Sequence, residues 1–146
     1  MYLLDTNVVS ELRKIKSNKV DKAVVEWFSK VSSEMLFISV ITLLEIEMGI
    51  LSKQRKDPDQ GAVLKLWFNN QVIPAFANRV LDIDTDVALQ CARLHVPDPR
   101  SDRDALIAAT ALVHNLTIVT RNIDDFQPTG VAIINPWESN CNELTL

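Results

Sequence analysis

Acidic side chains occur at four separate places in the sequence where an apolar segment begins, ends or is interrupted. These four residues are Asp5, Glu45, Asp104 and Asp125. Carboxylates that are held together repel one another and raise one another's pKa, unless a hard divalent cation with oxygen ligands neutralises them. If folding brings the four together, they predict a site for Mg²⁺ or Mn²⁺, and such an ion can activate water for hydrolysis.

Each core acid also has an ordinary structural alternative. Asp5 can serve as a turn or N-cap residue. Thr42 and Glu45 have the spacing of a capping box, and Ser101 with Asp104 can form a similar device at a helix start. These alternatives explain the acids one at a time, whereas only the metal site explains why all four fall at one predicted edge.

The elements that must position these acids follow from the apolar pattern. Short runs that are apolar throughout predict buried strands at residues 2–4, 35–38, 80–83, 117–120 and 131–134. Helical spacing predicts one helix that begins after Asp5 and another that runs from Ser39 or Thr42 to about Ser52. Four further helices are predicted at residues 20–31, 62–75, 86–94 and 104–114. Residues 53–61 have the composition of a loop.

Strands that are apolar on both faces and alternate with helices indicate a mainly parallel sheet that is covered on both sides. The predicted fold is therefore a three-layer α/β/α sandwich. Ligands bind beyond the carboxyl ends of the strands in such sheets, which is where Asp5, Asn122 and Asp125 fall. Asn122 and Asp125 both offer an oxygen ligand after the fourth predicted strand.

Length and composition set the remaining limits. A chain of 146 residues predicts a single domain over residues 1–146, and 47% hydrophobic residues exclude a disordered chain. The formal net charge of −4 provides no overall positive field, so any nucleic-acid site must be local. Candidates for local contacts are the basic clusters at residues 13–16 and 53–56, although such clusters are more often solvated surface.

Two cysteines, Cys91 and Cys141, are too few for a disulfide scaffold and are expected to be buried, reduced thiols. No secretion signal is recognisable, and no apolar run is long enough to cross a membrane. The expected location is the cytoplasm.

Several segments combine these features in a recognisable order. They are residues 4–12 (LDTNVVSEL), Ser39-x-x-Thr42-x-x-Glu45, residues 104–111 (DALIAATA), residues 119–126 (VTRNIDDF) and Asn135-Pro136-Trp137. Together they resemble the PIN-domain ribonucleases, in particular the VapC/FitB-like toxins of toxin–antitoxin pairs. The resemblance implies a PIN fold and an Mg²⁺- or Mn²⁺-dependent endoribonuclease that cleaves RNA to inhibit translation. Its implied partners are a small antitoxin protein and a second copy in a homodimer or larger complex.

The resemblance also assigns roles to individual positions. Asp5, Glu45 and Asp104 match the three core acidic ligands, and Asp125 is favoured as the fourth because Asn122 carries no charge. Asn122 is then a neutral ligand or a hydrogen-bonding partner. Positions that match the polar lining of the family's cleft are Thr6, Asn7, Ser39 and Thr120, and Arg121 lies beside them as a possible substrate contact.

Two alternative functions are compatible with these features. One is an enzyme class that also has acids at strand ends, and the other is a PIN fold without activity. A haloacid-dehalogenase-like phosphatase or a phosphorylated receiver domain also gathers carboxylates around Mg²⁺. The phosphatase needs a paired Asp-x-Asp, however, and this chain has Asn7 two residues after Asp5. The non-enzymatic alternative is a catalytically inactive PIN fold that serves only as a binding module.

Overall fold

A parallel sheet lies at the centre of the molecule in a computed structural model that describes residues 1–138. Within that range it has five strands: β1 (Tyr2–Leu4), β2 (Leu36–Ser39), β3 (Val80–Leu81), β4 (Thr117–Val119) and β5 (Ile133–Ile134). Their order is β3-β2-β1-β4-β5, and every neighbouring pair is parallel. In the central register, Tyr2 lies opposite both Leu36 and Thr117.

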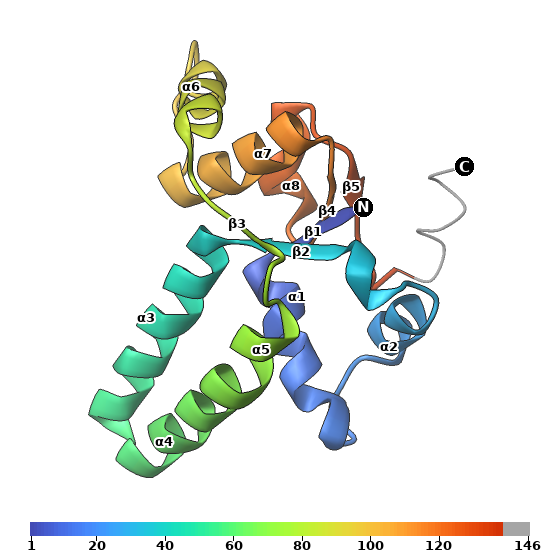
Figure 1. Cartoon of the computed structure of the whole chain (residues 1–146), viewed down its shortest axis with the longest axis vertical. Coiled ribbons are helices and arrows are strands. Elements are labelled where there is room, and N and C mark those ends of the chain that lie inside the picture. Colours follow the sequence, from blue (N-terminus) through green and yellow to red (C-terminus); the bar gives the residue numbers. More distant parts are fainter. Residues whose placement is uncertain (139–146) are drawn as a thin grey trace.

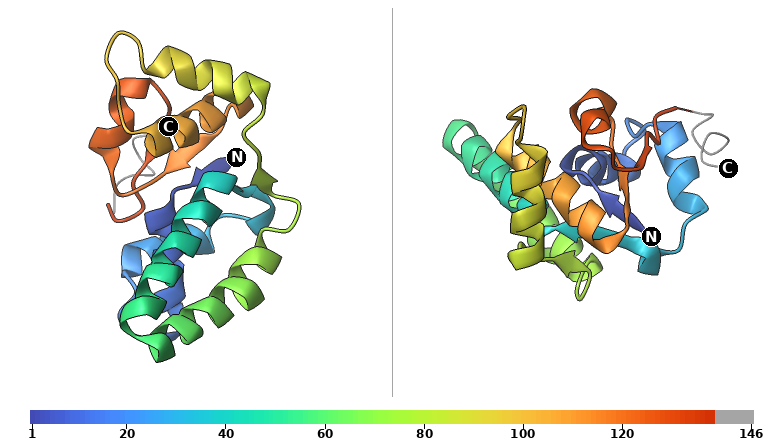
Figure 2. Two further views of the ribbon diagram at one scale, coloured as in Figure 1. Left: turned by 90° about the vertical axis from the view of Figure 1, so that its left-hand side faces the viewer. Right: turned by 90° about the horizontal axis from the view of Figure 1, so that it is seen from above.

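Helices cover both faces of the sheet, which confirms the predicted α/β/α sandwich (Figures 1 and 2). One layer contains α6 (Thr85–Leu94), α7 (Asp102–His114) and α8 (Ile123–Phe126). The other contains α1 (Thr6–Leu12), α2 (Lys22–Ser29), α3 (Val40–Lys56), α4 (Pro58–Trp67) and α5 (Ile73–Ala75). Short 3₁₀ turns span Arg13–Lys16, Ser33–Met35 and Gln127–Thr129, and a π-helical turn at Phe68–Val72 joins α4 to α5.

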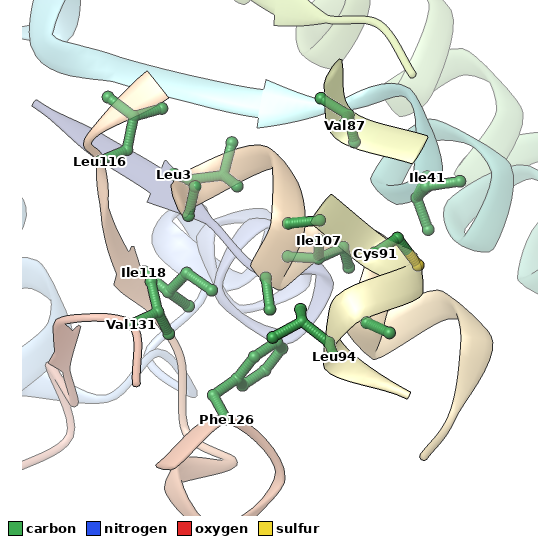
Figure 3. Packing of buried hydrophobic residues seen from close by; sticks show 14 residues of the cluster. Leu3, Ile41, Val87, Cys91, Leu94, Ile107, Leu116, Ile118, Phe126 and Val131 are labelled. Carbon is green, nitrogen blue, oxygen red and sulfur yellow. The ribbon is translucent and has the colours of Figure 1, made fainter. Parts of the chain in front are cut away.

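Successive residues of the strands supply two hydrophobic cores, because side chains alternate between the faces of a sheet. On the α6–α8 face, Leu3 packs with Ile107 and Phe126 (Figure 3). On the other face, the next residue along, Leu4, packs with Trp27. This burial on both sides explains why the strands are apolar throughout rather than alternating with polar residues.

The segment at residues 53–61 is helical, so the predicted loop is wrong over most of its length. Helix α3 continues to Lys56, and α4 begins at Pro58 directly after its N-cap, Asp57. Proline suits the first turn of a helix, where no backbone donor is needed. Gly61 allows the two helices to cross closely, since a Cβ there would lie 2.6 Å from the Cα of Gln54.

The strand ends place the predicted site residues at one edge. The backbone N–H of Asp5 donates to the carbonyl of Val119 (2.9 Å), so the residues that follow β1 and β4 are adjacent. Helix α3 begins directly after β2, where the Ser39 hydroxyl accepts from the N–H of Ile41 (3.0 Å). The first turns of α1 and α3 therefore both start at the carboxyl edge of the sheet.

Two expectations concern features outside this edge. Cys91 is free and buried, as expected, and Cys141 lies outside the described residues. Over residues 1–138, the structure contains no helix with the length and apolar character that crossing a membrane requires.

Candidate metal centre

Asp5 is a helix cap and a buried site carboxylate at the same time. Its Oδ1 accepts from the N–H of Thr6 (2.8 Å), which caps α1. Its Oδ2 accepts from the Thr120 hydroxyl (2.8 Å) and the Asn7 side-chain amide (3.3 Å). A carboxylate can accept about four hydrogen bonds, so these three fix its orientation and leave lone-pair capacity for a ligand.

Thr120 connects the loop after β4 to this carboxylate. Its hydroxyl oxygen accepts from the Asn7 amide (3.3 Å) and from the N–H of Asn122 (3.0 Å), in addition to donating to Asp5. The N–H of Arg121 donates to Oδ1 of Asn7 (3.3 Å). The buried Thr120 thus holds the β4 loop and the start of α1 in one hydrogen-bonded unit.

Glu45 is brought to the site by α3 and is oriented by Thr6. The Thr6 hydroxyl lies 2.7 Å from Oε1 of Glu45 and 3.4 Å from the hydroxyl of the buried Thr42. The capping-box alternative for Thr42 and Glu45 is wrong, because α3 begins at Val40 and Ser39 is its cap. Thr42 and Glu45, which are three residues apart on α3, therefore both contact Thr6 at the acidic site.

Asp104 lies in the first turn of α7, which begins at Asp102. Ser101 occupies the N-cap position but makes no side-chain capping hydrogen bond, so the capping part of the helix-start alternative is wrong. Asp104 does lie in the first turn, where the helix dipole favours an acid. Burial raises the pKa of Asp104 to about 6, with contributions from the charges of Asp5, Asp125 and Glu45 that outweigh the lowering effect of Arg103. Burial likewise raises the pKa of Asp5, and the charges of Glu45 and Asp125 add to it.

The charges of Glu45 and Asp125 affect both Asp5 and Asp104, so the four predicted acids lie near enough to one another to interact electrostatically, and Asp125 is the exposed member, on α8. Within residues 1–138, no group of three or more acidic, histidine or cysteine side chains is already arranged to hold a metal ion. Side-chain rotation and water would have to complete the shell. Mg²⁺ tolerates this arrangement because it binds through one or two carboxylates and retains several waters. The donor chemistry therefore fits a hard divalent cation.

Three predicted lining residues have other contacts. Ser39 is fully buried and its hydroxyl caps α3. The guanidinium of Arg121 lies 5.2 Å from the ring centre of Trp137, a cation–π contact. Asn122 is exposed, and it is its backbone N–H that bonds to Thr120. The structure therefore joins Thr6, Asn7 and Thr120 to the acids through their side chains.

Arg103 contacts the site, although the sequence motifs did not predict it. Its Nε lies 3.7 Å from Oε2 of Glu45, and another guanidinium nitrogen lies 3.6 Å from the sulfur of Met48. The sequence contained a signal, because Arg103 directly precedes Asp104, but nothing in the sequence showed that α3 and α7 approach each other. Nothing in the sequence showed that Thr42 contacts Thr6 either.

The fold and the site define an α/β protein with a parallel sheet and acidic side chains at the carboxyl edge, where ligands bind in proteins of this class. Residues 2–130 match the PIN domain family, and the chain belongs to it. It is 35% identical to "VapC ribonuclease Y4jK" of Sinorhizobium fredii, over 94% of this chain and 99% of the relative. It is 34% identical to "Toxin FitB" of Neisseria gonorrhoeae, again over 94% and 99%.

The structural comparison leads to the same family. The crystal structure of FitAcB from Neisseria gonorrhoeae superposes with a TM-score of 0.84 at 32% identity, covering 94% of this chain and 99% of the matched chain. The predicted resemblance to VapC/FitB-like PIN domains is confirmed. Membership of this family separates the chain from the haloacid-dehalogenase-like and receiver alternatives.

Proposed function

We propose that this protein is a metal-dependent endoribonuclease, the toxin of a toxin–antitoxin pair, which hydrolyses RNA phosphodiester bonds and so inhibits translation in the cytoplasm. The observation that carries the proposal is the hydrogen-bonded unit at the carboxyl edge of the sheet, in which Thr6 contacts both Asp5 and Glu45 and Thr120 joins the loop after β4 to Asp5. The charges of Asp5, Glu45 and Asp125 raise the pKa of Asp104, which supports a place for Asp104 and Asp125 beside this unit. Membership of the PIN family and the names of the VapC and FitB relatives support the same activity.

The four carboxylates are the proposed ligands for Mg²⁺ or Mn²⁺. When bound, the ion supplies charge stabilisation for the phosphoryl oxygens and activates water. The chain's own contribution is to hold the ligands: Thr6 orients Glu45, and Thr120 with Asn7 orients Asp5. Groups that position a ligand in this way usually change metal affinity or activity by about 10- to 100-fold when removed.

Cleavage of a labelled RNA in Mg²⁺ or Mn²⁺ tests this function. The wild-type protein should cut internally, chelation should stop the reaction, and Glu45→Gln should abolish it while the circular dichroism spectrum stays unchanged. Asp59→Asn, an exposed acid on α4, provides a matched control that should cut at the wild-type rate. A wild-type protein that binds partners but does not cut RNA in either ion would instead be an inactive PIN binding module.

The proposed partners are a small antitoxin protein and a second copy of this chain. Support comes from the "Toxin FitB" relative, whose structures include FitAB bound to a DNA fragment. Co-expression with the product of an adjacent small reading frame should yield a stable complex and suppress RNA cleavage. Size-exclusion chromatography with light scattering should give twice the chain mass for the toxin alone, and a monomer at micromolar concentration would contradict the homodimer.

A further inference from the structure

A hollow of about 540 Å³ opens beside the acidic centre, between α1, α3 and α4. Thr6 and Glu45 belong to both, so the hollow is continuous with the proposed active site. From there it extends along the α3–α4 hairpin as far as Lys53 and Asp57. A ligand in the part of the hollow next to Thr6 would contact the side of Glu45.

The lining combines an apolar wall with two cations. Ile50, Leu64 and Trp67 supply apolar and aromatic surface. Arg13 and Lys53 are exposed and also line the hollow, and no acid within residues 1–138 forms a salt bridge with either. The two basic clusters that lie far apart in the sequence therefore each contribute one residue to the same hollow.

The acids of the lining are already engaged. Asp57 accepts from the N–H of Gln60 (3.2 Å) as the cap of α4, and Glu45 belongs to the acidic centre. Away from Glu45, the hollow thus offers the capping carboxylate of Asp57 and two cations that no described acid pairs with, next to an apolar and aromatic surface. This pairing suits a nucleotide, because phosphates bind cations and bases stack on aromatic or apolar side chains.

Gly49 keeps the hollow open on the α3 side. It lies one turn after Glu45, lines the hollow, and a Cβ built on it would meet no atom within 4 Å. Its lack of a side chain is therefore not required by packing within the protein. A larger residue would instead occupy the hollow.

We propose that this hollow is a nucleotide-binding subsite for single-stranded RNA, next to the phosphodiester that the acidic centre hydrolyses. Arg13 and Lys53 bind the flanking phosphates, and one unstacked base lies against Trp67 and Leu64. A base inside a duplex is stacked and cannot enter a hollow between helices. The subsite rests on the proposed ribonuclease function, which it refines by naming the form of the substrate.

Gly49→Leu tests the subsite with little risk to the fold, because leucine is a better helix former than glycine. The probe is a fluorescein-labelled single-stranded RNA of eight nucleotides with mixed sequence, with binding measured by anisotropy in Ca²⁺ and cleavage measured in Mg²⁺. Gly49→Leu should weaken binding by about tenfold or more and slow cleavage, as expected for the loss of one stacked base. Mn²⁺ affinity and the unfolding midpoint should not fall.

A matched control adds the same side chain on the opposite face of α4. Gln60 and Leu64 line the hollow, and the exposed Ala62 lies about 200° around the helix from each of them. Ala62→Leu therefore adds its side chain away from the hollow. This variant should bind and cut the RNA like the wild type. A comparable loss in Ala62→Leu would contradict the assignment of the effect to the hollow.

The cations have a separate signature in the salt dependence of binding. The double variant Arg13→Gln/Lys53→Gln should lower the slope of log affinity against log salt by about 1.4, since each phosphate contact to a single strand contributes about 0.7. Lys30→Gln, which removes an exposed charge paired with Glu26 on α2, should leave the slope unchanged.

The outcomes separate the subsite from the ribonuclease function. Mg²⁺-dependent cleavage by the wild type, with Gly49→Leu binding and cutting RNA equally well, would overturn the subsite and keep the function; the hollow would then belong to another ligand, such as a peptide of a partner protein. RNA binding that Gly49→Leu weakens, without cleavage by the wild type, would keep the subsite and overturn the function. A wild type that neither binds nor cuts the RNA would overturn both.

Discussion

The two sides of the acidic centre are built differently. Asp5, at the end of β1, is buried and accepts three hydrogen bonds, from Thr6, Asn7 and Thr120. Asp125, after β4, is exposed on the short helix α8, and the structure ties its backbone to Asn122. One carboxylate is fixed by the core of the fold, whereas the other is supplied by a surface segment.

The difference in burial indicates that Asp5 contributes more to the site than Asp125 does. A buried carboxylate that is held in one orientation cannot be replaced by water without leaving its donors unpaired. An exposed carboxylate can be replaced by water in the shell of an ion at a smaller cost. We therefore expect activity to depend steeply on Asp5 and more weakly on Asp125, and the following variants test that ranking.

Asp5→Asn should have the largest effect, a loss of RNA cleavage by about a thousandfold or more, beyond what the removal of a supporting group costs. Asparagine is as good an N-cap as aspartate, so α1 should keep its cap and the protein should stay folded. Its melting temperature should reflect two opposed effects, the loss of one acceptor for Asn7 and Thr120 and the removal of a buried charge. Cleavage rates in Mg²⁺ and thermal unfolding followed by circular dichroism measure the activity and the melting temperature. Wild-type cleavage by a folded Asp5→Asn protein would remove Asp5 from the catalytic centre.

Thr120→Val should come next, with a loss of about 10- to 100-fold in Mn²⁺ affinity and in cleavage. Valine keeps the shape of the buried side chain but removes the hydroxyl that Asp5, Asn7 and Asn122 share. Leaving these groups without a partner should also lower the free energy of unfolding by about 1–3 kcal/mol. Thr120→Ser, which retains the hydroxyl, is the control and should recover most of the metal affinity.

Asp125→Asn should reduce Mn²⁺ affinity by about tenfold, less than either change on the buried side, because water can replace an exposed ligand. Asn122→Ala should change it little, since this side chain carries no charge and the structure ties Asn122 to Thr120 through its backbone. Calorimetric titration of both variants compares them directly. A larger loss for Asn122→Ala than for Asp125→Asn would reverse the choice between the two as the fourth ligand.

The smallest effect concerns stability and pH. The raised pKa values of Asp104, at about 6, and of Asp5 mean that the native state binds these protons more tightly than the unfolded chain. Their contribution to stability is therefore greatest below the ordinary aspartate pKa, and it is lost as pH rises through about 4 to 6. In chelator, the melting temperature should fall by a few degrees across this range.

Asp104→Asn should reduce that fall in melting temperature, and Mg²⁺ should raise the melting temperature of the wild type near neutral pH. Differential scanning fluorimetry at several pH values measures both. A steeper fall in Asp104→Asn than in the wild type would show that ionisation of this carboxyl does not cause the loss of stability.

The same contrast separates what the sequence predicts from what only folding reveals. Leu3 and Leu4 predict a strand that is buried on both faces, and the structure places them in the two different cores. The apolar residues of α7 likewise predict its burial. These elements are decided by local pattern and by the need to cover a sheet.

The remaining features depend on contacts between distant segments. The helical path through Lys56 and Pro58 could not be predicted, because polar residues there resemble a loop until Gly61 allows α3 and α4 to cross. The role of Thr120 follows from the pairing of β1 with β4, and the approach of Arg103 to Glu45 follows from that of α7 to α3. Individual side-chain partners of this kind do not appear in periodicity or spacing.

The most direct test of the account is the Mn²⁺ affinity of four neutral variants, Asp5→Asn, Glu45→Gln, Asp104→Asn and Asp125→Asn, measured by calorimetry. Asp86→Asn, an exposed acid in the first turn of α6, serves as the control. Binding should be weaker in all four, with the largest loss in Asp5→Asn and the smallest in Asp125→Asn, and it should be unchanged in Asp86→Asn. Wild-type affinity in Asp5→Asn, Glu45→Gln or Asp104→Asn would contradict the claim that these carboxylates form one metal centre.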